Sequence, residues 1–265
     1  MHYVISDIHG CYNEYITALK TINFSDNDIL YILGDCIDRG YASIKVLQDM
    51  MFRPNVIPIV GNHEYMAVKV LEDLCVEITE ENVETQITAD TMRYYTDWMF
   101  NGGDSTIEEF NQLSLSEKYD LLDYLKDFSL YEKVSVNGKS YLLVHGGLEP
   151  FSAGMTVEDF SVPQLLFSRA DLDRTYFYDT YTITGHTPTI AEEGNKGTVI
   201  KRNNHISIDC GCVFGYNLAV YCMETDTEIY VPSGRCIYLP DHAVHSEKTL
   251  ELGGRRHGKN QKNGK

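Results

Sequence analysis

Five separate apolar stretches of strand-like length each end in a run that combines a glycine with a carboxylate, imidazole or amide side chain. The runs are Asp7-Ile8-His9-Gly10, Gly34-Asp35-Cys36-Ile37-Asp38-Arg39-Gly40, Gly61-Asn62-His63-Glu64, His145-Gly146-Gly147 and Gly185-His186-Thr187-Pro188. In open α/β sheets, ligands bind outside the carboxyl ends of the strands. We therefore expect an α/β fold in which all five runs meet at one site.

The first 74 residues alternate between strand and helix patterns. Strands are expected at 3–6, 29–33 and 56–60, and helices at 12–22, 44–51 and 65–74. This order predicts parallel strands joined by right-handed crossovers. Pro58 cannot donate a ladder hydrogen bond, so the third strand is expected near a sheet edge.

Residues 75–130 read as a helical insert beside the sheet. An acidic stretch at 77–84 precedes helical patterns at 90–100, 105–112 and 116–128, the last with Ser116 as its expected N-cap. Strands follow at 131–136, 140–144, 181–184, 205–208 and 218–223, and Asn137-Gly138 predicts a hairpin between the first two. The simplest architecture is one domain, residues 1–240, built as a mixed β-sandwich flanked by helices. Residues 241–265 read as a basic, glycine-rich, solvated tail, with a docking element for an acidic partner as the alternative.

Charge and composition exclude several classes of protein. The net charge is −17, which argues against a general nucleic-acid or anionic-membrane binder. The chain has no apolar run near the ~20 residues that span a bilayer. Its N-terminus reaches Asp7 without a basic region, so a cytoplasmic protein is expected. The odd number of cysteines, seven, predicts reduced and mostly buried thiols.

The side chains in the five runs suit metal ions. Asp7 and His9 are two residues apart at a strand end, so both point the same way. A set of two carboxylates, three histidines and one asparagine, without thiolates, fits manganese, iron or zinc. That set exceeds the needs of one ion and suits a pair about 3.5–4 Å apart that acts on phosphorus. A single buried histidine is more often a core residue, but five clusters after five strands favour a site. The other histidines, which lack this context, are His2, His205, His242, His245 and His257.

These motifs resemble the calcineurin-like metallophosphoesterases. They are most similar to the phosphoprotein phosphatase branch and, within it, to the bacterial and bacteriophage-lambda type serine/threonine phosphatases. The resemblance extends to Asn101-Gly102-Gly103, to Leu166-Phe167-Ser168-Arg169 and to the stretch 208–218, and reaches about Met223. It implies a four-layer α/β/β/α fold around a dinuclear metal centre.

The resemblance also implies a role for each matching position. The first of two divalent ions, with manganese expected and iron or zinc as alternatives, is held by Asp7 and His9. Asp35 bridges the ions, and the second is held by Asn62, His145 and His186. His63 matches the general acid and Asp38 the carboxylate that orients it. Arg39 and Arg169 match the arginines that bind the phosphate oxygens.

Simpler explanations remain open for some of these positions. Asp38 could pair with Arg39 at the surface, and Arg169 could form a structural salt bridge. Glu64 is expected to cap a helix rather than to take part in chemistry. Cys36 stands where the family often has a larger apolar residue or tyrosine. Together with Cys210 and Cys212 it suggests that oxidation inhibits the protein.

Three functions follow from these residues. The first is a phosphatase that hydrolyses phosphoserine or phosphothreonine monoesters of a protein or peptide, with phosphotyrosine as a further substrate, by attack of a metal-bridging hydroxide. The second is a symmetrical diadenosine tetraphosphate hydrolase, a group in which the position of Asp38 is often not acidic. The third is a non-catalytic metal-binding scaffold. A phosphorylated protein or peptide is the expected partner, with no nucleic acid and no membrane.

Overall fold

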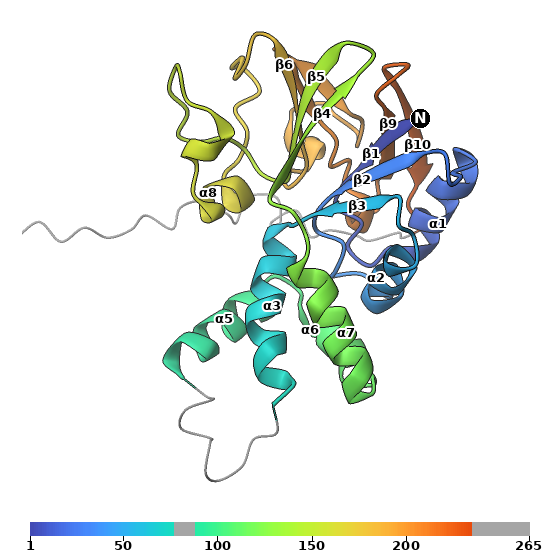
Figure 1. Cartoon of the computed structure of the whole chain (residues 1–265), viewed down its shortest axis with the longest axis vertical. Coiled ribbons are helices and arrows are strands. Elements are labelled where there is room, and N and C mark those ends of the chain that lie inside the picture. The colour runs from blue at the N-terminus through green and yellow to red at the C-terminus, as the bar shows by residue number, and fades with distance from the viewer. Residues whose placement is uncertain (77–87, 235–265) are drawn as a thin grey trace, which may run out of the picture.

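The computed structural model describes residues 1–76 and 88–234. Two five-stranded sheets pack face to face, and helices lie outside them (Figure 1). Sheet A has the order β10-β9-β1-β2-β3 and sheet B the order β4-β5-β6-β8-β7. This architecture confirms the predicted mixed β-sandwich flanked by helices.

Sheet A combines parallel and antiparallel pairs. Its strands are β1 (His2–Ile5), β2 (Ile29–Leu33), β3 (Val56–Ile59), β9 (Asn217–Cys222) and β10 (Thr227–Pro232). β1, β2 and β3 are parallel, whereas β9 is antiparallel to β1 and to β10. β3 is an edge strand, as Pro58 predicted.

Sheet B has the same mixture. Its strands are β4 (Tyr131–Val136), β5 (Lys139–Val144), β6 (Thr180–Thr184), β7 (Ile200–Arg202) and β8 (His205–Ser207). β5, β6 and β8 are parallel, and the antiparallel strands β4 and β7 form the two edges. The parallel strands of both sheets thus place their carboxyl ends on one side of the sandwich.

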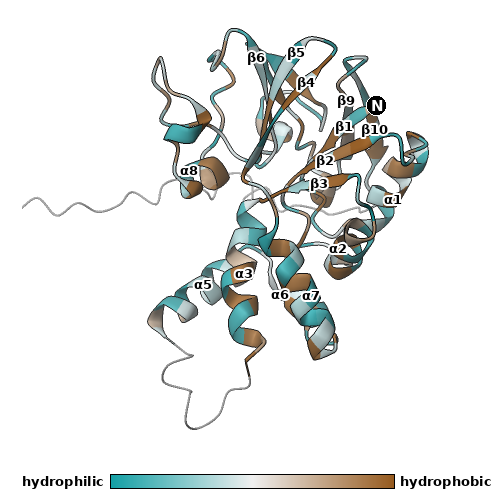
Figure 2. Cartoon of the chain, viewed as in Figure 1, coloured by the Kyte–Doolittle hydropathy of each residue, from teal (hydrophilic) through white to brown (hydrophobic). Residues whose placement is uncertain are grey.

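Alternate side chains of each strand enter different cores. Val4, Tyr31 and Leu33 of sheet A pack between the sheets against Leu143 and Ile183 of sheet B. The opposite face of sheet A packs on the helices, and the opposite face of sheet B on the segment 148–177. β2 is apolar at every position because both of its faces are buried (Figure 2).

The helices are α1 (Tyr12–Thr21), α2 (Ser43–Met51), α3 (Asn62–Leu74), α5 (Ala89–Phe100), α6 (Asp104–Phe110), α7 (Leu115–Lys126) and α8 (Val162–Phe167). Helices α1, α2 and α3 follow strands of sheet A, α5, α6 and α7 come after α3, and α8 follows β5 of sheet B. Three short 3₁₀ turns, η1 (Val157–Asp159), η2 (Thr189–Ala191) and η3 (Cys212–Phe214), lie in loops. Helices α5, α6 and α7 occur where the helical insert was predicted and pack beside α2 and α3 (Figure 1).

The structure differs from the sequence-based expectations at several places. Helix α3 begins at Asn62, three residues before the predicted start, so Asn62 and His63 belong to its first turn. Ser116 is not an N-cap. Ser114 caps α7 instead. Its side chain accepts from the Glu117 amide, and the Glu117 carboxylate accepts from the Ser114 amide. Strands β7 and β10 and helix α8 were not predicted. The acidic stretch at 77–84 and the tail at 241–265 lie outside the described residues.

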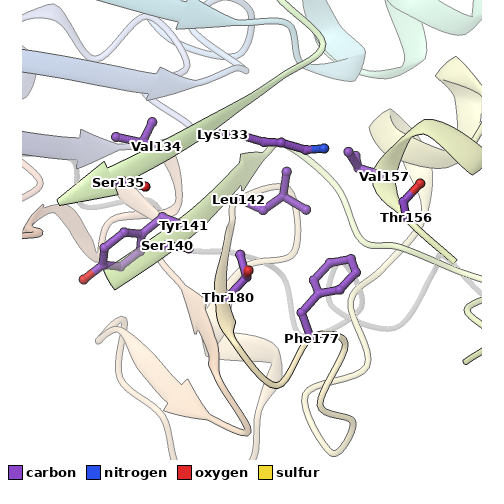
Figure 3. Close-up of a pocket in the computed structure, with 10 residues that line it drawn as sticks. All are labelled: Lys133, Val134, Ser135, Ser140, Tyr141, Leu142, Thr156, Val157, Phe177 and Thr180. Atoms are coloured by element: carbon purple, nitrogen blue, oxygen red, sulfur yellow. The ribbon is translucent and has the colours of Figure 1, made fainter. Parts of the chain in front are cut away.

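A pocket of about 310 Å³ lies on the outer face of sheet B (Figure 3). Leu142 of β5, Val157 and Phe177 contribute its apolar lining, and Lys133 stands at its rim. The ammonium group of Lys133 forms a salt bridge with Glu158. None of the predicted site residues lines this pocket. Within residues 1–76 and 88–234, no helix is long and apolar enough to cross a membrane.

Candidate active site

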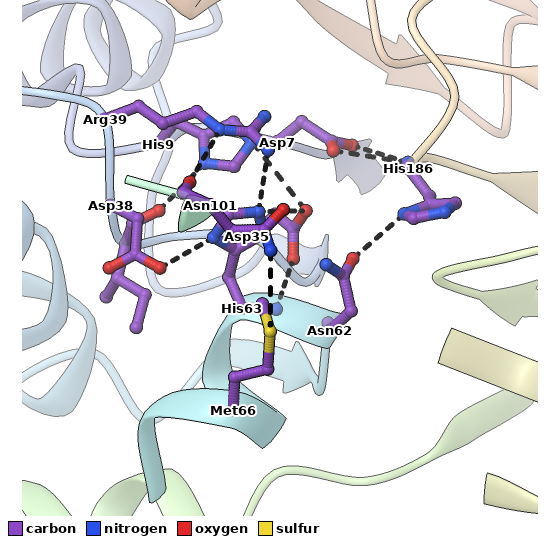
Figure 4. A network of polar contacts seen from close by, with 12 residues as sticks. Asp7, His9, Asp35, Asp38, Arg39, Asn62, His63, Met66, Asn101 and His186 are labelled. Atoms are coloured by element: carbon purple, nitrogen blue, oxygen red, sulfur yellow. Dashed lines mark hydrogen bonds and ion pairs between the residues drawn. The ribbon is translucent and has the colours of Figure 1, made fainter. Parts of the chain in front are cut away.

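All five sequence runs meet at the carboxyl ends of β1, β2, β3, β5 and β6. Figure 4 shows Asp7, Asp35, Asn62 and His186 in this region. The loop after β1 is joined to the loop after β2, because the His9 amide donates to the Asp35 carbonyl at 2.8 Å. The Gly185 amide donates to the His145 carbonyl at 2.9 Å and joins the loops of sheet B. The His186 amide donates to Oδ2 of Asp7 at 3.0 Å and connects the two sheets. The structure therefore brings the five runs together, as the strand-end rule predicted.

Six non-glycine residues of the site have a left-handed backbone conformation, with φ between 45° and 72°. They are Asp7, His9, Asp35, Asp38, Arg39 and His186. This conformation costs such residues roughly 1 kcal/mol or more each and concentrates at functional sites. Here it turns the chain sharply after each strand, so that the polar side chains point back toward a common centre. The sequence pattern contained no sign of it.

Glycines permit the loops to approach one another. A Cβ atom on Gly61 would lie 2.5 Å from the Asp35 amide nitrogen and 2.8 Å from Oε2 of Glu64. A Cβ atom on Gly185 would overlap the Ser6 hydroxyl and the Asp7 carboxylate. No side chain fits at either position, which explains why glycines border the polar residues.

Two groups of ligand atoms share Asp35. His9, Asp35 and His63 form one group and Asp35, His145 and His186 the other, with the atoms of each group within 4.8 Å of one another. Oδ2 of Asp35 lies 3.7 Å from Nε2 of His9, and Oδ1 lies 3.4 Å from Nε2 of His145. Histidine and aspartate side chains are thus positioned to bind metal on both sides of one carboxylate.

The hydrogen bonds of two histidines leave one nitrogen of each ring without a hydrogen. Nδ1 of His9 lies 2.8 Å from the Ile37 carbonyl, and Nδ1 of His145 lies 2.6 Å from the Leu33 carbonyl. A carbonyl oxygen only accepts, so Nδ1 carries the hydrogen in both rings. Their Nε2 atoms therefore direct lone pairs at Asp35, the arrangement in which protein groups orient a metal-binding histidine.

Burial shapes the titration of these groups. It raises the pKa of Asp7, and the negative charge of Asp209 raises it further. The pKa of Asp35 is raised by burial and then by the charge of Glu64. Burial lowers the pKa values of His9 and His145. A bound divalent cation would favour charged carboxylates and neutral imidazoles, so the residues present fit such an ion.

His63, a member of the first ligand group, forms a buried pair with Asp38. Nδ1 of His63 lies 2.6 Å from Oδ2 of Asp38, and both side chains are fully buried. Burial raises the pKa of Asp38 to about 7, although hydrogen bonds from Thr106 and Trp98 oppose the rise. The alternative of a surface ion pair between Asp38 and Arg39 is wrong, because Asp38 is not at the surface.

Arg39 lies over the first ligand group (Figure 4). Its Nη1 is 3.0 Å from Nε2 of His9, and its Nη2 is 2.9 Å from Nε2 of His63. The guanidinium is supported on one side by the Asn101 carbonyl, which accepts from Nε at 3.2 Å, and on the other by the ring of Phe214. Arg39 is therefore placed to bind an oxyanion that lies beside His9 and His63.

Arg169 follows α8 in a segment that packs on the His145 loop. The Gly147 amide donates to the Ser168 carbonyl at 2.6 Å, and a Cβ atom on Gly147 would lie 2.7 Å from the Arg169 carbonyl oxygen. This contact brings the Arg169 backbone next to His145. Its role in binding phosphate stays a prediction.

Four further residues support the site. Glu64 accepts hydrogen bonds from the amides of Gly61, Asp35 and Cys36, at 2.9, 2.9 and 2.7 Å. It thus caps α3, as expected, and also fixes the loop after β2. Asp209, buried after β8 beside Asp7, belonged to a stretch of family resemblance but had no predicted role. Trp98 and Thr106 contact Asp38 and were missed, since a buried tryptophan on a helix reads as core.

The thiols near the site are protected. Cys36, Cys210 and Cys212 are all buried. Burial raises the pKa of Cys36 well above its usual value and that of Cys210 to about 12. Because the thiolate is the reactive form, these positions do not favour the oxidative inhibition that the sequence suggested.

A known protein family matches most of this chain. The model of the calcineurin-like phosphoesterases matches residues 3–227. This chain belongs to that family. The fold and the metal-binding arrangement of His9, Asp35, His145 and His186 agree with this assignment.

Individual relatives carry different activities in their names. Serine/threonine-protein phosphatase 2 of Salmonella typhimurium is 29% identical over 83% of this phosphoesterase and 91% of its own length. An asymmetrical bis(5'-nucleosyl)-tetraphosphatase, PrpE of Halalkalibacterium halodurans, is 24% identical over 87% of this chain and 93% of its own length. A symmetrical bis(5'-nucleosyl)-tetraphosphatase of Wigglesworthia glossinidia brevipalpis is 40% identical, but over only 37% of each chain.

The fold also matches solved structures. A candidate diadenosine tetraphosphatase superimposes with a TM-score of 0.59 and 17% identity, and covers 88% of this chain and 93% of that one. At this identity the match concerns the fold alone. The comparisons therefore show a phosphoesterase and leave its substrate to be proposed.

Proposed function

We propose that this phosphoesterase is a metal-dependent phosphoprotein phosphatase that hydrolyses phosphoserine and phosphothreonine monoesters, with phosphotyrosine as a further substrate. The observation that carries the proposal is the 2.6 Å contact between Nδ1 of His63 and Oδ2 of Asp38, with both groups fully buried beside the ligand groups. Serine and threonine are poor leaving groups and need a proton as the ester bond breaks. A histidine backed by a carboxylate supplies one.

Six side chains would hold two divalent ions, with manganese as our expectation. Asp7 and His9 would hold the first ion, Asn62, His145 and His186 would hold the second, and Asp35 would contribute to both positions. Bound there, the ions would activate water for attack on phosphorus and offset the charge of the phosphate. The oxygen and imidazole donors, without thiolate, support this assignment.

The protein's own groups would bind the ester and manage the proton. Arg39 contacts His9 and His63 in the structure, and a cation held by His9 would repel it. We therefore expect its guanidinium to turn to the phosphate oxygens, where Arg169 joins it. Nε2 of His63 then gives its proton to the ester oxygen of serine or threonine as the P–O bond breaks. The charge of Asp38 stabilises the imidazolium before this transfer.

Hydrolysis of a dinucleoside tetraphosphate is the second candidate. The similarity to the PrpE relative extends over 93% of that protein, whereas the symmetrical enzyme matches over 37%. This favours the asymmetrical reaction over the symmetrical one that the sequence suggested. In either reaction the leaving group is a nucleotide phosphate, which departs without a proton donor. The buried pair of His63 and Asp38 would then have no purpose, so we rank this function second.

One assay separates these functions. The manganese-loaded protein is tested on phosphoserine, phosphothreonine and phosphotyrosine peptides and on diadenosine tetraphosphate, with kcat/KM measured for each. We expect the peptides to be preferred. A kcat/KM at least ~100-fold higher on the dinucleotide would overturn the proposal. Its products would then identify the reaction, ATP and AMP for the asymmetrical cleavage and two ADP for the symmetrical one.

A further inference from the structure

The corner between α5 and α6 contacts Asp38 through two buried side chains. Nε1 of Trp98, in α5, lies 2.6 Å from Oδ2 of Asp38. Oγ1 of Thr106, in α6, lies 2.6 Å from Oδ1. Trp98 is 0% and Thr106 1% exposed, so water does not compete for these bonds. The two oxygens of the Asp38 carboxylate thus accept from residues that lie 60 and 68 positions further along the chain.

The indole contact determines how His63 is protonated. An indole N–H can only donate, so Oδ2 of Asp38 is an acceptor. Nδ1 of His63 meets the same oxygen at 2.6 Å and must then be the donor. A histidine that keeps its hydrogen on Nδ1 takes up and releases its second proton at Nε2. Nε2 is the nitrogen that faces Asp35 and Arg39.

The corner is built to keep these donors in place. Gly103 has no side chain, and a Cβ atom there would lie 2.6 Å from the Trp98 ring. The Gly103 amide donates to the Trp98 carbonyl at 3.1 Å. The neighbouring Gly102 carbonyl accepts from the Arg39 amide at 2.9 Å. The stretch Asn101-Gly102-Gly103 thus joins the support of Asp38 to that of Arg39.

We infer that Trp98 and Thr106 are positioning residues that act through Asp38 to hold His63 in the tautomer and orientation needed for proton transfer at Nε2. This inference rests on the proposed role of His63 as proton donor. It assigns a function to helices α5 and α6, which otherwise lie beside the sandwich. Loss of either donor would remove one of the hydrogen bonds that fix the Asp38 carboxylate and would affect only the step that needs the proton.

The test uses variants that remove one donor and keep its shape. Trp98→Phe removes the N–H and Thr106→Val the hydroxyl, while Thr106→Ser restores it. Thr182→Val is the matched control, because Thr182 is also a threonine 1% exposed but its hydroxyl has no partner within the described part of the chain. For each variant, kcat and KM are measured on a phosphoserine peptide and on 4-nitrophenyl phosphate, whose leaving group needs no proton. Metal content and thermal unfolding confirm that each variant is intact.

We expect Trp98→Phe and Thr106→Val each to lower kcat on the peptide by about tenfold, as for a lost hydrogen bond to a charged group. On 4-nitrophenyl phosphate the loss should stay below about threefold, with KM unchanged on both substrates. Thr106→Ser should recover most of the peptide activity, and Thr182→Val should retain it. In a His63→Asn background, neither donor variant should cause a further loss, because the group it positions is gone.

Two results would overturn the inference in distinguishable ways. In one result, the donor variants lose equal activity on both substrates while His63→Asn still loses far more on the peptide. This would show that Trp98 and Thr106 serve only packing. Equal losses on both substrates in His63→Asn itself would remove the proton donor, and with it the proposed function on which the inference rests.

Discussion

Oδ1 of Asn62 lies 2.9 Å from Nε2 of His145, and neither atom has a hydrogen for the other. The hydrogen of His145 is on Nδ1, which donates to the Leu33 carbonyl. Oδ1 of Asp35 is a third acceptor, 3.4 Å from the same Nε2. Three acceptor atoms this close repel one another unless a cation lies among them. The polar contacts alone therefore point to a divalent ion at this place.

Chelation should both inactivate and destabilise the protein. If the ions bind at about 100 times their dissociation constant, removing one costs roughly 2.7 kcal/mol of folding stability, or several degrees in Tm. Activity and Tm are measured before and after EDTA treatment and after addition of Mn²⁺, Fe²⁺, Zn²⁺ or Mg²⁺. We expect manganese to restore both most fully. A Tm that EDTA leaves unchanged would contradict the stabilising role of the metal.

Asp35→Asn should disturb both metal positions together. Its two oxygens face different ligand groups, so the loss of its charge affects the ions on both sides. We expect turnover to become undetectable and the metal content to fall from two ions per chain to less than one. Asp7→Asn is the comparison, because Asp7 is proposed to hold the first ion alone and its loss should spare the second. Two tightly bound ions in Asp35→Asn would rule out a shared ligand.

His63→Asn should separate metal binding from proton transfer. The substitution replaces the ionisable ring with a neutral, polar amide, so both ions should stay bound. On a phosphoserine peptide we expect kcat to fall by ~10²–10⁴-fold, the usual contribution of a general acid. On 4-nitrophenyl phosphate the fall should be much smaller. Metal analysis is the control, and a variant that has lost an ion would identify His63 as a ligand instead.

Much of the site could be predicted because its residues follow strands directly. Parallel strands end at a common edge, so Asp7, Asp35 and His145 were placed together by their position after apolar runs. Pro58 marked an edge strand for an equally local reason. These inferences need no knowledge of how distant segments pack.

The remaining features depend on packing between distant segments. Trp98 and Thr106 reach Asp38 across 60 and 68 residues, and nothing in their helical pattern indicates which side chain they meet. Helix α3 begins at Asn62 because its polar first turn faces the site, whereas apolar periodicity starts only near Met66. Strand β10 was missed since its exposed first residue, Thr227, and the acidic Glu228 weaken the strand pattern at a sheet edge.

Gly61→Ala should damage the site through space alone. Gly61 has an ordinary backbone conformation, with φ −100°, but an added Cβ would lie 2.5 Å from the Asp35 amide nitrogen. We expect a loss of roughly 2–3 kcal/mol in unfolding free energy and a lower affinity for metal. Urea unfolding and metal titration measure these effects. Gly234→Ala is the control. Among the described residues its Cβ would meet only Glu14, at an ordinary 3.5 Å, so it should change neither quantity.

Acidification should destabilise the protein through His205, which lies away from the ligand groups in β8. Its Nε2 lies 2.8 Å from the Thr184 hydroxyl, its Nδ1 has no partner among the described residues, and its side chain is 1% exposed. Burial lowers the pKa of His205 to about 4 from the usual 6.5. The unfolded chain therefore binds this proton more readily than the folded one between these two values. Stability should be fully present above pH 6.5 and be lost as the pH falls toward 4.

The loss attributable to this one histidine should approach ~3 kcal/mol at pH 4. Other groups also titrate in this range, so the wild-type protein is compared with His205→Gln. The glutamine amide can still bond to the Thr184 hydroxyl but cannot take up the proton. Urea unfolding of both proteins at pH 7.5, 6.0 and 5.0, without metal, gives the difference in unfolding free energy. The wild-type protein should weaken more steeply than the variant at each step, because only its folded state excludes a proton that the unfolded state accepts. Parallel pH curves would show that His205 is already charged, or is hydrated, in the folded protein.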